Sequence, residues 1–105
     1  MAFVSGSALL DAIVLSAAAR EGTYGYKITQ DVRSVMEVSE STLYPVLRRL
    51  QKEGYLTTYD QEYGGRNRRY YRITPAGRER LAAALAEWEE NKRRIDSVFY
   101  GGEDR

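Results

Sequence analysis

Residues 39–74 hold the pattern that most restricts how this chain can fold. Hydroxyl side chains open a stretch with helical periodicity, arginines lie further along it, and Gly54 closes it. Two stretches rich in aromatic and β-branched residues follow, separated by a glycine turn and an arginine cluster. A helix followed by a basic hairpin is the outline of a winged helix-turn-helix, in which one helix enters the major groove of DNA.

The helix predicted at the start of this segment has clear boundary signals. Ser39 is a suitable N-cap because its hydroxyl can accept a hydrogen bond from a first-turn amide, and Glu40 suits the positive end of the helix dipole. The apolar residues at helical spacing predict a buried stripe of Leu43, Val46, Leu47 and Leu50. The other faces are left to hydroxyl, aromatic and arginine side chains.

The hairpin is predicted from strands over residues 55–59 and 69–73, with residues 60–68 as its tip. Gly64 and Gly65 would let this tip approach a phosphate backbone closely. Positive charge is concentrated here, because residues 45–72 hold seven cationic and three anionic side chains, a net +4, while the whole chain carries only +1. The charge excess therefore lies where a winged helix meets DNA.

Three further helices are predicted, over residues 7–20, 24–36 and 75–98. Glu21 and Gly22 would close the first, and the second places Tyr24, Ile28, Val32 and Val35 on one face. Thr74 and Pro75 form an N-cap and a first-turn proline for the last helix. That helix carries a heptad-like stripe, which predicts a dimer interface of Leu81, Leu85, Trp88, Ile95 and Phe99.

Composition removes several classes of function. The chain has no cysteine and no histidine, which excludes disulfides, the common zinc sites and histidine general bases, so we expect neither an enzyme nor a cofactor. Its longest apolar run, residues 8–19, is too short and polar to span a membrane, and the default location is the cytoplasm. A chain of 105 residues forms one modest core, and an oligomer would help it bury more surface.

The sequence resembles the PadR family of bacterial transcriptional regulators, specifically the short branch with a single C-terminal helix. The shared motifs run through nearly the whole chain: Gly25-Tyr26 with Ile28, Thr42-Leu43-Tyr44-Pro45 with Leu47-Arg48-Arg49-Leu50, Gly54, and Arg69-Tyr70-Tyr71 with Ile73-Thr74 and Gly77. The resemblance implies a homodimer that binds operator DNA, and in many members represses genes until a small molecule loosens it. We expect a DNA-binding domain over residues 1–74 and a dimerisation helix over residues 75–100, followed by a tail (101–105) whose small and charged residues predict disorder.

The multidrug-sensing members of this family pair a tryptophan of the last helix with its symmetry mate, and planar ligands stack between the two rings. Trp88 stands at that position in the context Ala86-Glu87-Trp88. The resemblance therefore implies a ligand pocket at Trp88, with candidate neighbours Leu9, Ala12, Ile13, Asn91 and Lys92. The alternative is that Trp88 and these neighbours only pack the dimer core.

The expected DNA contacts combine hydroxyl, amide, tyrosine and cationic side chains, which donate to phosphates or base edges. They are Lys27, Ser39, Ser41, Thr42, Tyr44, Arg48, Arg49, Arg66, Asn67 and Arg68. The alternative is an ordinary capped surface helix and a hairpin tip kept polar against edge pairing. A rival from another class is a winged-helix module that binds a protein partner, with a small-molecule binder that lacks DNA function as a third possibility.

Overall fold

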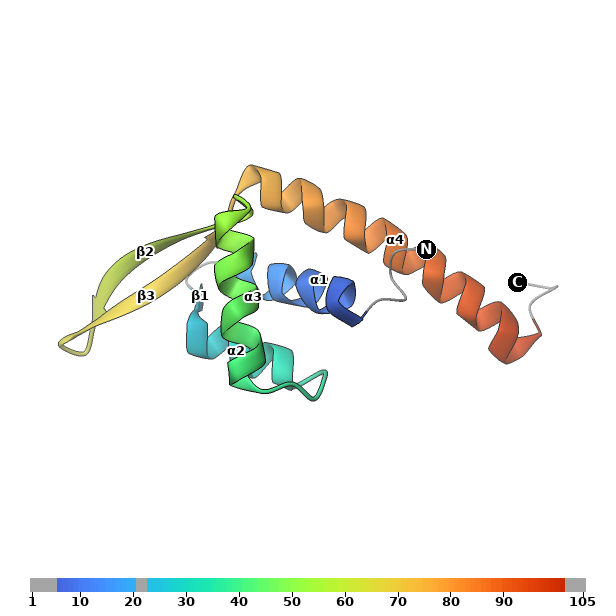
Figure 1. Ribbon diagram of the computed structural model, residues 1–105, viewed down its shortest axis with the longest axis horizontal. Helices are drawn as coiled ribbons and strands as arrows, with labels where there is room; N and C mark the ends of the chain where they lie inside the picture. Colours follow the sequence, from blue (N-terminus) through green and yellow to red (C-terminus); the bar gives the residue numbers. More distant parts are fainter. Residues whose placement is uncertain (1–5, 21–22, 102–105) are drawn as a thin grey trace.

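The computed structural model describes residues 6–20 and 23–101, and within them it is mostly helical with one small sheet (Figure 1). The elements in chain order are α1 (Gly6–Ala18), β1 (Thr23–Tyr24), α2 (Gly25–Arg33), α3 (Glu40–Lys52), β2 (Leu56–Tyr63), β3 (Arg66–Ile73) and α4 (Pro75–Tyr100). The predicted fold class, a winged helix-turn-helix with a long C-terminal helix, is confirmed. Glu21 and Gly22, predicted to close the first helix, lie outside the described residues.

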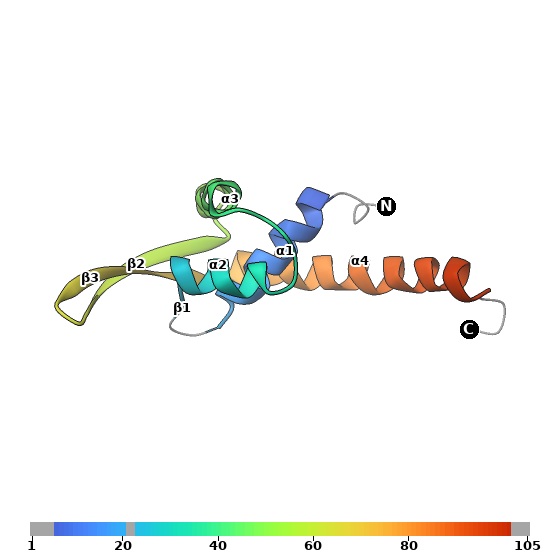
Figure 2. The same cartoon turned by 90° about the horizontal axis from the view of Figure 1, so that it is seen from below.

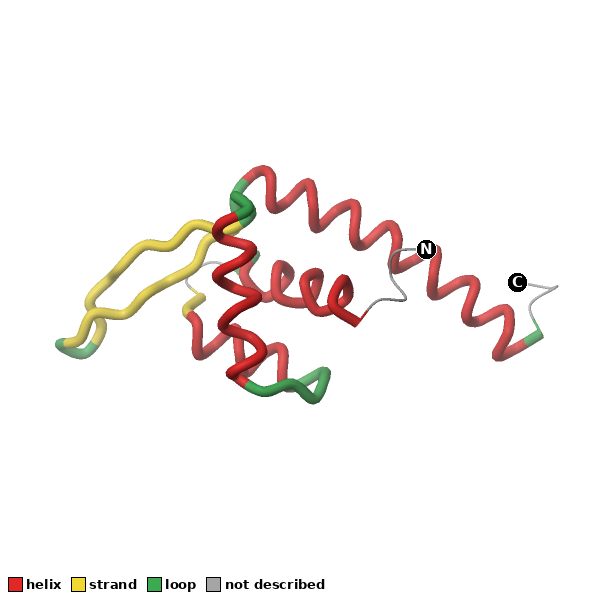
Figure 3. Tube along the Cα trace, in the orientation of Figure 1, coloured by secondary structure: helices red, strands yellow, loops and turns green. Residues whose placement is uncertain are grey.

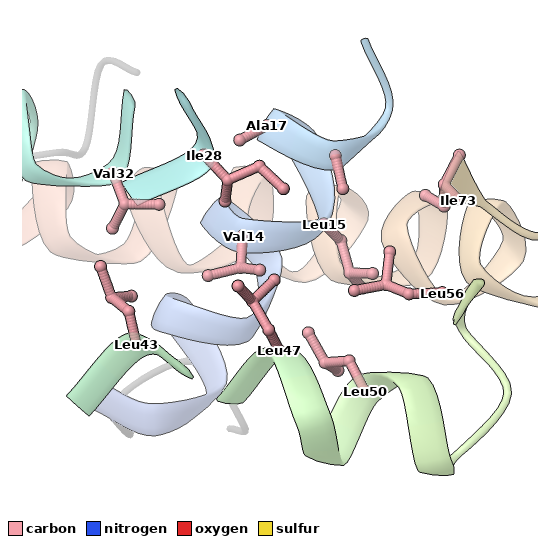
Figure 4. Packing of buried hydrophobic residues seen from close by; sticks show 11 residues of the cluster. Val14, Leu15, Ala17, Ile28, Val32, Leu43, Leu47, Leu50, Leu56 and Ile73 are labelled. Carbon is pink, nitrogen blue, oxygen red and sulfur yellow. The ribbon is translucent and has the colours of Figure 1, made fainter. Parts of the chain in front are cut away.

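The hydrophobic core lies where α1, α2, α3 and the base of the hairpin meet (Figure 4). Leu43, Leu47 and Leu50 of the predicted α3 stripe are fully buried, and Val46 packs against the core from its edge. Burying one such leucine stabilises the fold by roughly 1.5–3 kcal/mol. This burial fixes which face of α3 is turned outward. The pattern of α1 did not single out Leu15, which is also fully buried.

The second helix is shorter than the predicted range 24–36. It begins at Gly25 because Tyr24 belongs to β1, and it ends at Arg33, where the chain turns towards α3. Val35 was predicted to share one face of this helix with Ile28 and Val32, but it lies beyond the end of the helix. Beyond the end of α2 the helical periodicity no longer applies, and Val35 is 66% exposed.

The sheet has three antiparallel strands in the order β1-β3-β2. The hairpin strands continue well beyond the predicted ranges, pairing from Leu56 with Ile73 to Tyr63 with Arg66. Only Gly64 and Gly65 form the turn, with φ values of 60° and 80°. A two-residue turn with both φ values positive matches the twist of the flanking strands. The strands therefore stay paired in register up to the turn, although their residues there are polar. The result is the long wing that extends from the body in Figure 1.

The α4 helix begins as predicted. Thr74 caps it by accepting a 2.9 Å hydrogen bond from the Gly77 amide, and Pro75 occupies the first turn. The helix runs to Tyr100, two residues beyond the predicted end, and Gly101 closes it in the left-handed conformation. The rest of the predicted tail lies outside the described residues.

The N-terminal half of α4 packs along α1, while its C-terminal half extends past the body (Figures 1 and 3). In this half Ile95, Val98 and Phe99 remain exposed. Among the described residues, no helix combines the length and the apolar character that crossing a membrane requires.

Candidate nucleic-acid interface

The outward face of α3 is set by the three leucines buried on its opposite side. Ser41, Thr42, Tyr44 and Arg48 of the expected DNA contacts are all exposed. Residues three or four apart are neighbours on one side of a helix, so Ser41, Tyr44 and Arg48 occupy the same side over two turns. This is the geometry by which a recognition helix presents several side chains to one groove.

The start of α3 is ordered by its own hydroxyl groups. The Ser39 side chain accepts a 3.2 Å hydrogen bond from the Thr42 amide, which confirms Ser39 as the N-cap. The Ser39 Oγ also lies 2.9 Å from Ser41 Oγ and 3.1 Å from Thr42 Oγ1. Each hydroxyl keeps further donor or acceptor capacity, so a cap of this kind can also meet a phosphate. The capping role and a contact to DNA are therefore compatible.

The wing carries its predicted cations in two different environments. Arg66 and Asn67 are exposed beside the turn. Arg68 is half-buried, because its guanidinium lies 4.0 Å from the ring centroids of both Tyr24 and Tyr63. A cation held between two aromatic faces keeps its charge while losing rotational freedom. Arg66 is thus free to reach outward, whereas Arg68 also fastens the wing to β1.

An aromatic and arginine ladder continues along this same face of the sheet. The Tyr24 ring meets the Tyr70 ring at 5.7 Å, and Tyr70 stacks on Tyr59 at 5.4 Å. Arg72 then lies over the Tyr59 ring at 4.5 Å. Aromatic pairs of this geometry stabilise a structure by about 0.5–1.5 kcal/mol each beyond simple burial. The ladder stiffens a hairpin that would otherwise be exposed on both faces.

A groove of about 800 Å³ lies between the wing and the starts of α2 and α3. Its charged lining residues are all arginines: Arg66, Arg68 and Arg69. Arg69 was not among the predicted contacts, and its guanidinium also pairs with Asp60 at 3.3 Å. A concave surface whose charged lining is entirely positive attracts and orients a polyanion.

The beginning of α2 opens into this groove. Its N-cap position is Tyr24, whose side chain makes no capping hydrogen bond, so the first-turn amides are not satisfied from that residue. Gly25 lies against two tyrosine rings: a Cβ on it would sit 3.5 Å from Cε1 of Tyr44 and 3.6 Å from Cε1 of Tyr71. Partial burial raises the pKa of Tyr71, and nearby Arg69 opposes that rise. An uncapped helix N-terminus beside tyrosine hydroxyls is a suitable site for a phosphate.

Two of the predicted cationic contacts form ion pairs within the chain. Lys27 pairs with Asp31 at 2.9 Å on the surface of α2. Arg49 binds Asp11 of α1 at 2.6 Å and Glu53 at 3.3 Å. The hydrogen bond with Asp11 is the main cause that raises the pKa of Arg49. Arg49 therefore joins the outward helix to α1, a link that sequence reasoning missed because 38 residues separate the partners.

The structure separates the six residues suggested for a ligand pocket. Ala12 packs against Ala84 of α4 with Leu9 beside it, whereas Ile13 packs against the main core. On α4, Asn91 is buried and donates to the Glu87 carbonyl at 3.0 Å. Trp88 is partly exposed, and Lys92 pairs with Glu89 at 3.2 Å. Within one chain Leu9 and Ala12 thus lie at the contact with Ala84 of α4, Trp88 and Lys92 lie on the surface of α4, and Ile13 belongs to the main core.

Comparison with known proteins identifies the family of this winged helix. The family model described as the transcriptional regulator PadR-like family matches residues 14–83, which include α2, α3 and the whole wing. The chain belongs to the PadR-like family. The resemblance inferred from the sequence motifs is thereby confirmed. The members of this family are transcriptional regulators rather than enzymes.

Individual relatives and solved structures match over most of their length. The chain is 40% identical over 83 residues to transcriptional regulator Rv3488 of Mycobacterium tuberculosis, covering 78% of each protein. It is similar to the crystal structure of smu.1704 from Streptococcus mutans, with a TM-score of 0.87, 38% identity and coverage of 96% and 95% of the two chains. A PadR-like transcriptional regulator from Bacillus cereus superposes with a TM-score of 0.82 at 27% identity, covering 90% and 94%.

Proposed function

We propose that this PadR-like regulator acts in the cytoplasm as a homodimeric repressor that binds a pseudo-palindromic operator. The observation that carries the proposal is the groove between α3 and the wing, whose charged lining is entirely arginine. In this arrangement α3 enters the major groove, while Arg66 and the start of α2 hold the flanking phosphates. The exposed side chains of Ser41, Tyr44 and Arg48 face the base edges.

The dimer is supported by the exposed apolar stripe of α4. Leu85 and Ile95 remain 47% and 42% exposed in the single chain. Trp88, Val98 and Phe99 of the same helix are also exposed, and a concentration of exposed apolar side chains on one element marks an interaction surface. A two-fold dimer built on α4 would present two copies of α3, and half-sites about 34–36 Å apart, or a multiple of that, would match them. In such a dimer, residues 1–74 of each chain form the DNA-binding domain, called the reading head below, and residues 75–100 form the dimerisation helix.

A planar ligand between the two Trp88 rings is the proposed signal for release. The side chain lies on the same stripe as Leu85 and is partly exposed, so dimerisation brings it to the interface. A ligand there would favour a dimer whose reading heads no longer match the operator spacing, which is release by population shift.

Binding to the DNA immediately upstream of this protein's own gene tests the proposal. We expect labelled upstream DNA to bind more tightly than a scrambled duplex in fluorescence anisotropy. The logarithm of the affinity should fall with the logarithm of salt concentration by about 0.9 for each phosphate neutralised. Weak binding to both duplexes even at low salt would instead favour the rival reading, a winged-helix module for protein partners.

The wing variants belong to the same titration. Arg66→Ala should lower the affinity for upstream and scrambled DNA alike by about tenfold, because a charge-assisted contact to phosphate is lost. Arg68→Ala should weaken DNA binding and also lower thermal stability, because the Tyr24 and Tyr63 rings lose the cation between them. Arg93→Ala, on the exposed side of α4, is the control and should bind as the parent does. An unchanged salt slope in Arg66→Ala would contradict the assignment of the wing.

The ligand proposal is tested with planar cationic dyes, using the fluorescence of the single tryptophan in the chain. The dye should quench Trp88 and release DNA in the parent. In Trp88→Ala, dye affinity measured by the fluorescence of the dye should fall at least about tenfold, since aromatic stacking is lost. Trp88→Phe is the conservative control and should retain part of the affinity. Equal dye affinity in Trp88→Ala and the parent would overturn the pocket.

A further inference from the structure

A second hollow, separate from the DNA groove, lies behind the root of the wing. This rear pocket has a volume of about 370 Å³ and is lined by the end of α1, the base of the hairpin and the first turn of α4. Tyr71 is the one lining residue that it shares with the groove beside α3. In Figure 2 the C-terminal end of α1 lies on the opposite side of α4 from α3. Apart from Tyr71, the rear pocket is therefore built from residues that do not line the groove beside α3.

Three arginines supply all the charge on the walls of the rear pocket. Arg20 comes from the segment after α1, Arg72 from β3 and Arg78 from the first turn of α4. All three side chains are exposed, and none takes part in the ion pairs found within residues 6–20 and 23–101. Three like charges around one hollow repel one another, so an anion bound between them would relieve that repulsion.

The position of Arg78 strengthens this inference. A cation in the first turn faces the positive end of the helix dipole, where acidic residues are favoured, and the first turn of α4 contains no acidic residue. A residue that opposes a local structural preference, as a cation does in the first turn of a helix, is expected mainly at functional sites. The charge of Arg78 and the dipole of a 26-residue helix both add to the positive potential of the pocket.

Arg72 is held in place without being neutralised. Its guanidinium lies 4.5 Å from the centre of the Tyr59 ring, a contact that restricts the side chain but leaves its charge and its donors available. A carboxylate partner would have cancelled that charge. Preorganised guanidinium groups are well suited to the oxygens of a phosphate group, which they can bind through two parallel hydrogen bonds.

We infer that the rear pocket binds a small free ligand that carries a phosphate group. Its volume falls within the range of small-molecule sites and exceeds what a single phosphate fills, which leaves room for a compact organic body. Tyr59, Tyr71 and Ile73 would contact that body, while Arg20, Arg72 and Arg78 hold the phosphate oxygens. The site is independent of the pocket proposed at Trp88 and of the assignment of the DNA surface.

Thermal unfolding in sodium pyrophosphate tests the site directly, with sodium chloride of equal ionic strength as the reference. Pyrophosphate at ten times its dissociation constant should raise the Tm of the parent by roughly 5 °C or more. The double variant Arg72→Gln with Arg78→Gln should lose this rise. Because Arg72 also packs on Tyr59, the single variants Arg20→Gln and Arg78→Gln, at exposed positions, provide the same test with less risk to folding.

The matched control is Arg66→Gln, which removes a cation from the DNA groove and should keep the full rise. If Arg66→Gln loses the rise and the rear-pocket variants keep it, pyrophosphate binds the DNA surface and the inference is wrong. The inference also fails if pyrophosphate does not raise the Tm of the parent while the rear-pocket variants bind DNA more weakly and with a smaller dependence on salt concentration. In that case the three arginines serve the DNA backbone instead of a free ligand.

Discussion

Alanine at position 77 is expected to destabilise the folded protein by about 3 kcal/mol and to lower its Tm by roughly 10 °C or more. A Cβ on Gly77 would lie 2.2 Å from the carbonyl oxygen of Tyr55 and 2.7 Å from Cγ1 of Ile73. The oxygen belongs to the backbone and also accepts a 3.0 Å hydrogen bond from the Thr74 amide. The added methyl group therefore cannot be accommodated by a side-chain rotation.

The damage should be greatest at the junction between the wing and α4. The Thr74 hydroxyl donates to the Gly54 carbonyl at 2.7 Å, so the end of α3, the start of β2 and the start of α4 are tied together there. Gly6→Ala is the matched control, because a Cβ at Gly6 meets nothing within 4 Å and should leave the Tm near that of the parent or slightly raise it. Melting of Gly77→Ala close to the parent would show that the helix and Tyr55 do not approach so closely in solution.

Gly77 also shows where sequence reasoning stops. The sequence marks it as part of the shared family motif, and helix propensity adds only that a glycine slightly weakens the first turn of a helix. Its actual role depends on how closely the start of α4 approaches Tyr55, 22 positions earlier, which local patterns do not contain. By contrast, Ser39 and Thr74 were predicted as helix caps and act as caps, because capping depends on residues within one turn.

The core shows the same contrast between features set by neighbouring residues and features set by contacts between distant residues. The periodicity of α3 predicted the burial of Leu43, Leu47 and Leu50, since one face of that helix is covered along its length. Val35 was wrongly placed on α2 because the end of this helix carries no strong stop signal. The strand β1 was missed because two residues have no periodicity, and they become a strand only by pairing with Tyr70 and Tyr71.

The candidate interface was predicted as a set of residues but not as a geometry. The basic wing and the outward face of α3 follow from charge and helical spacing. The sandwich of Arg68 between two tyrosines and the bond from Arg49 to Asp11 depend on contacts across the fold. The latter bond links α3 to α1, the helix that packs along α4. It gives a rearrangement between α1 and α4 a physical route to α3, the helix proposed to read DNA.

A glutamate at position 85 or 95 is expected to convert the proposed dimer into a folded monomer and to lower operator affinity about a thousandfold, because the two reading heads no longer bind as one unit. Leu85 and Ile95 are about half-exposed in the single chain, so burying a charge at a dimer interface would cost far more than placing it on the monomer. Light scattering should give a mass near 12.0 kDa in place of twice that value.

Val35→Glu provides the matched control, because Val35 is an exposed apolar residue that lies far from α4 in the chain. It should remain a dimer and bind DNA as the parent does. Phe99→Glu tests the same interface near the end of α4, where a substitution is least expected to unfold the monomer. Circular dichroism should show unchanged helix content in all the variants. Full operator affinity in a variant that is monomeric by light scattering would mean that one reading head suffices, and retained dimers in all three α4 variants would place the interface elsewhere.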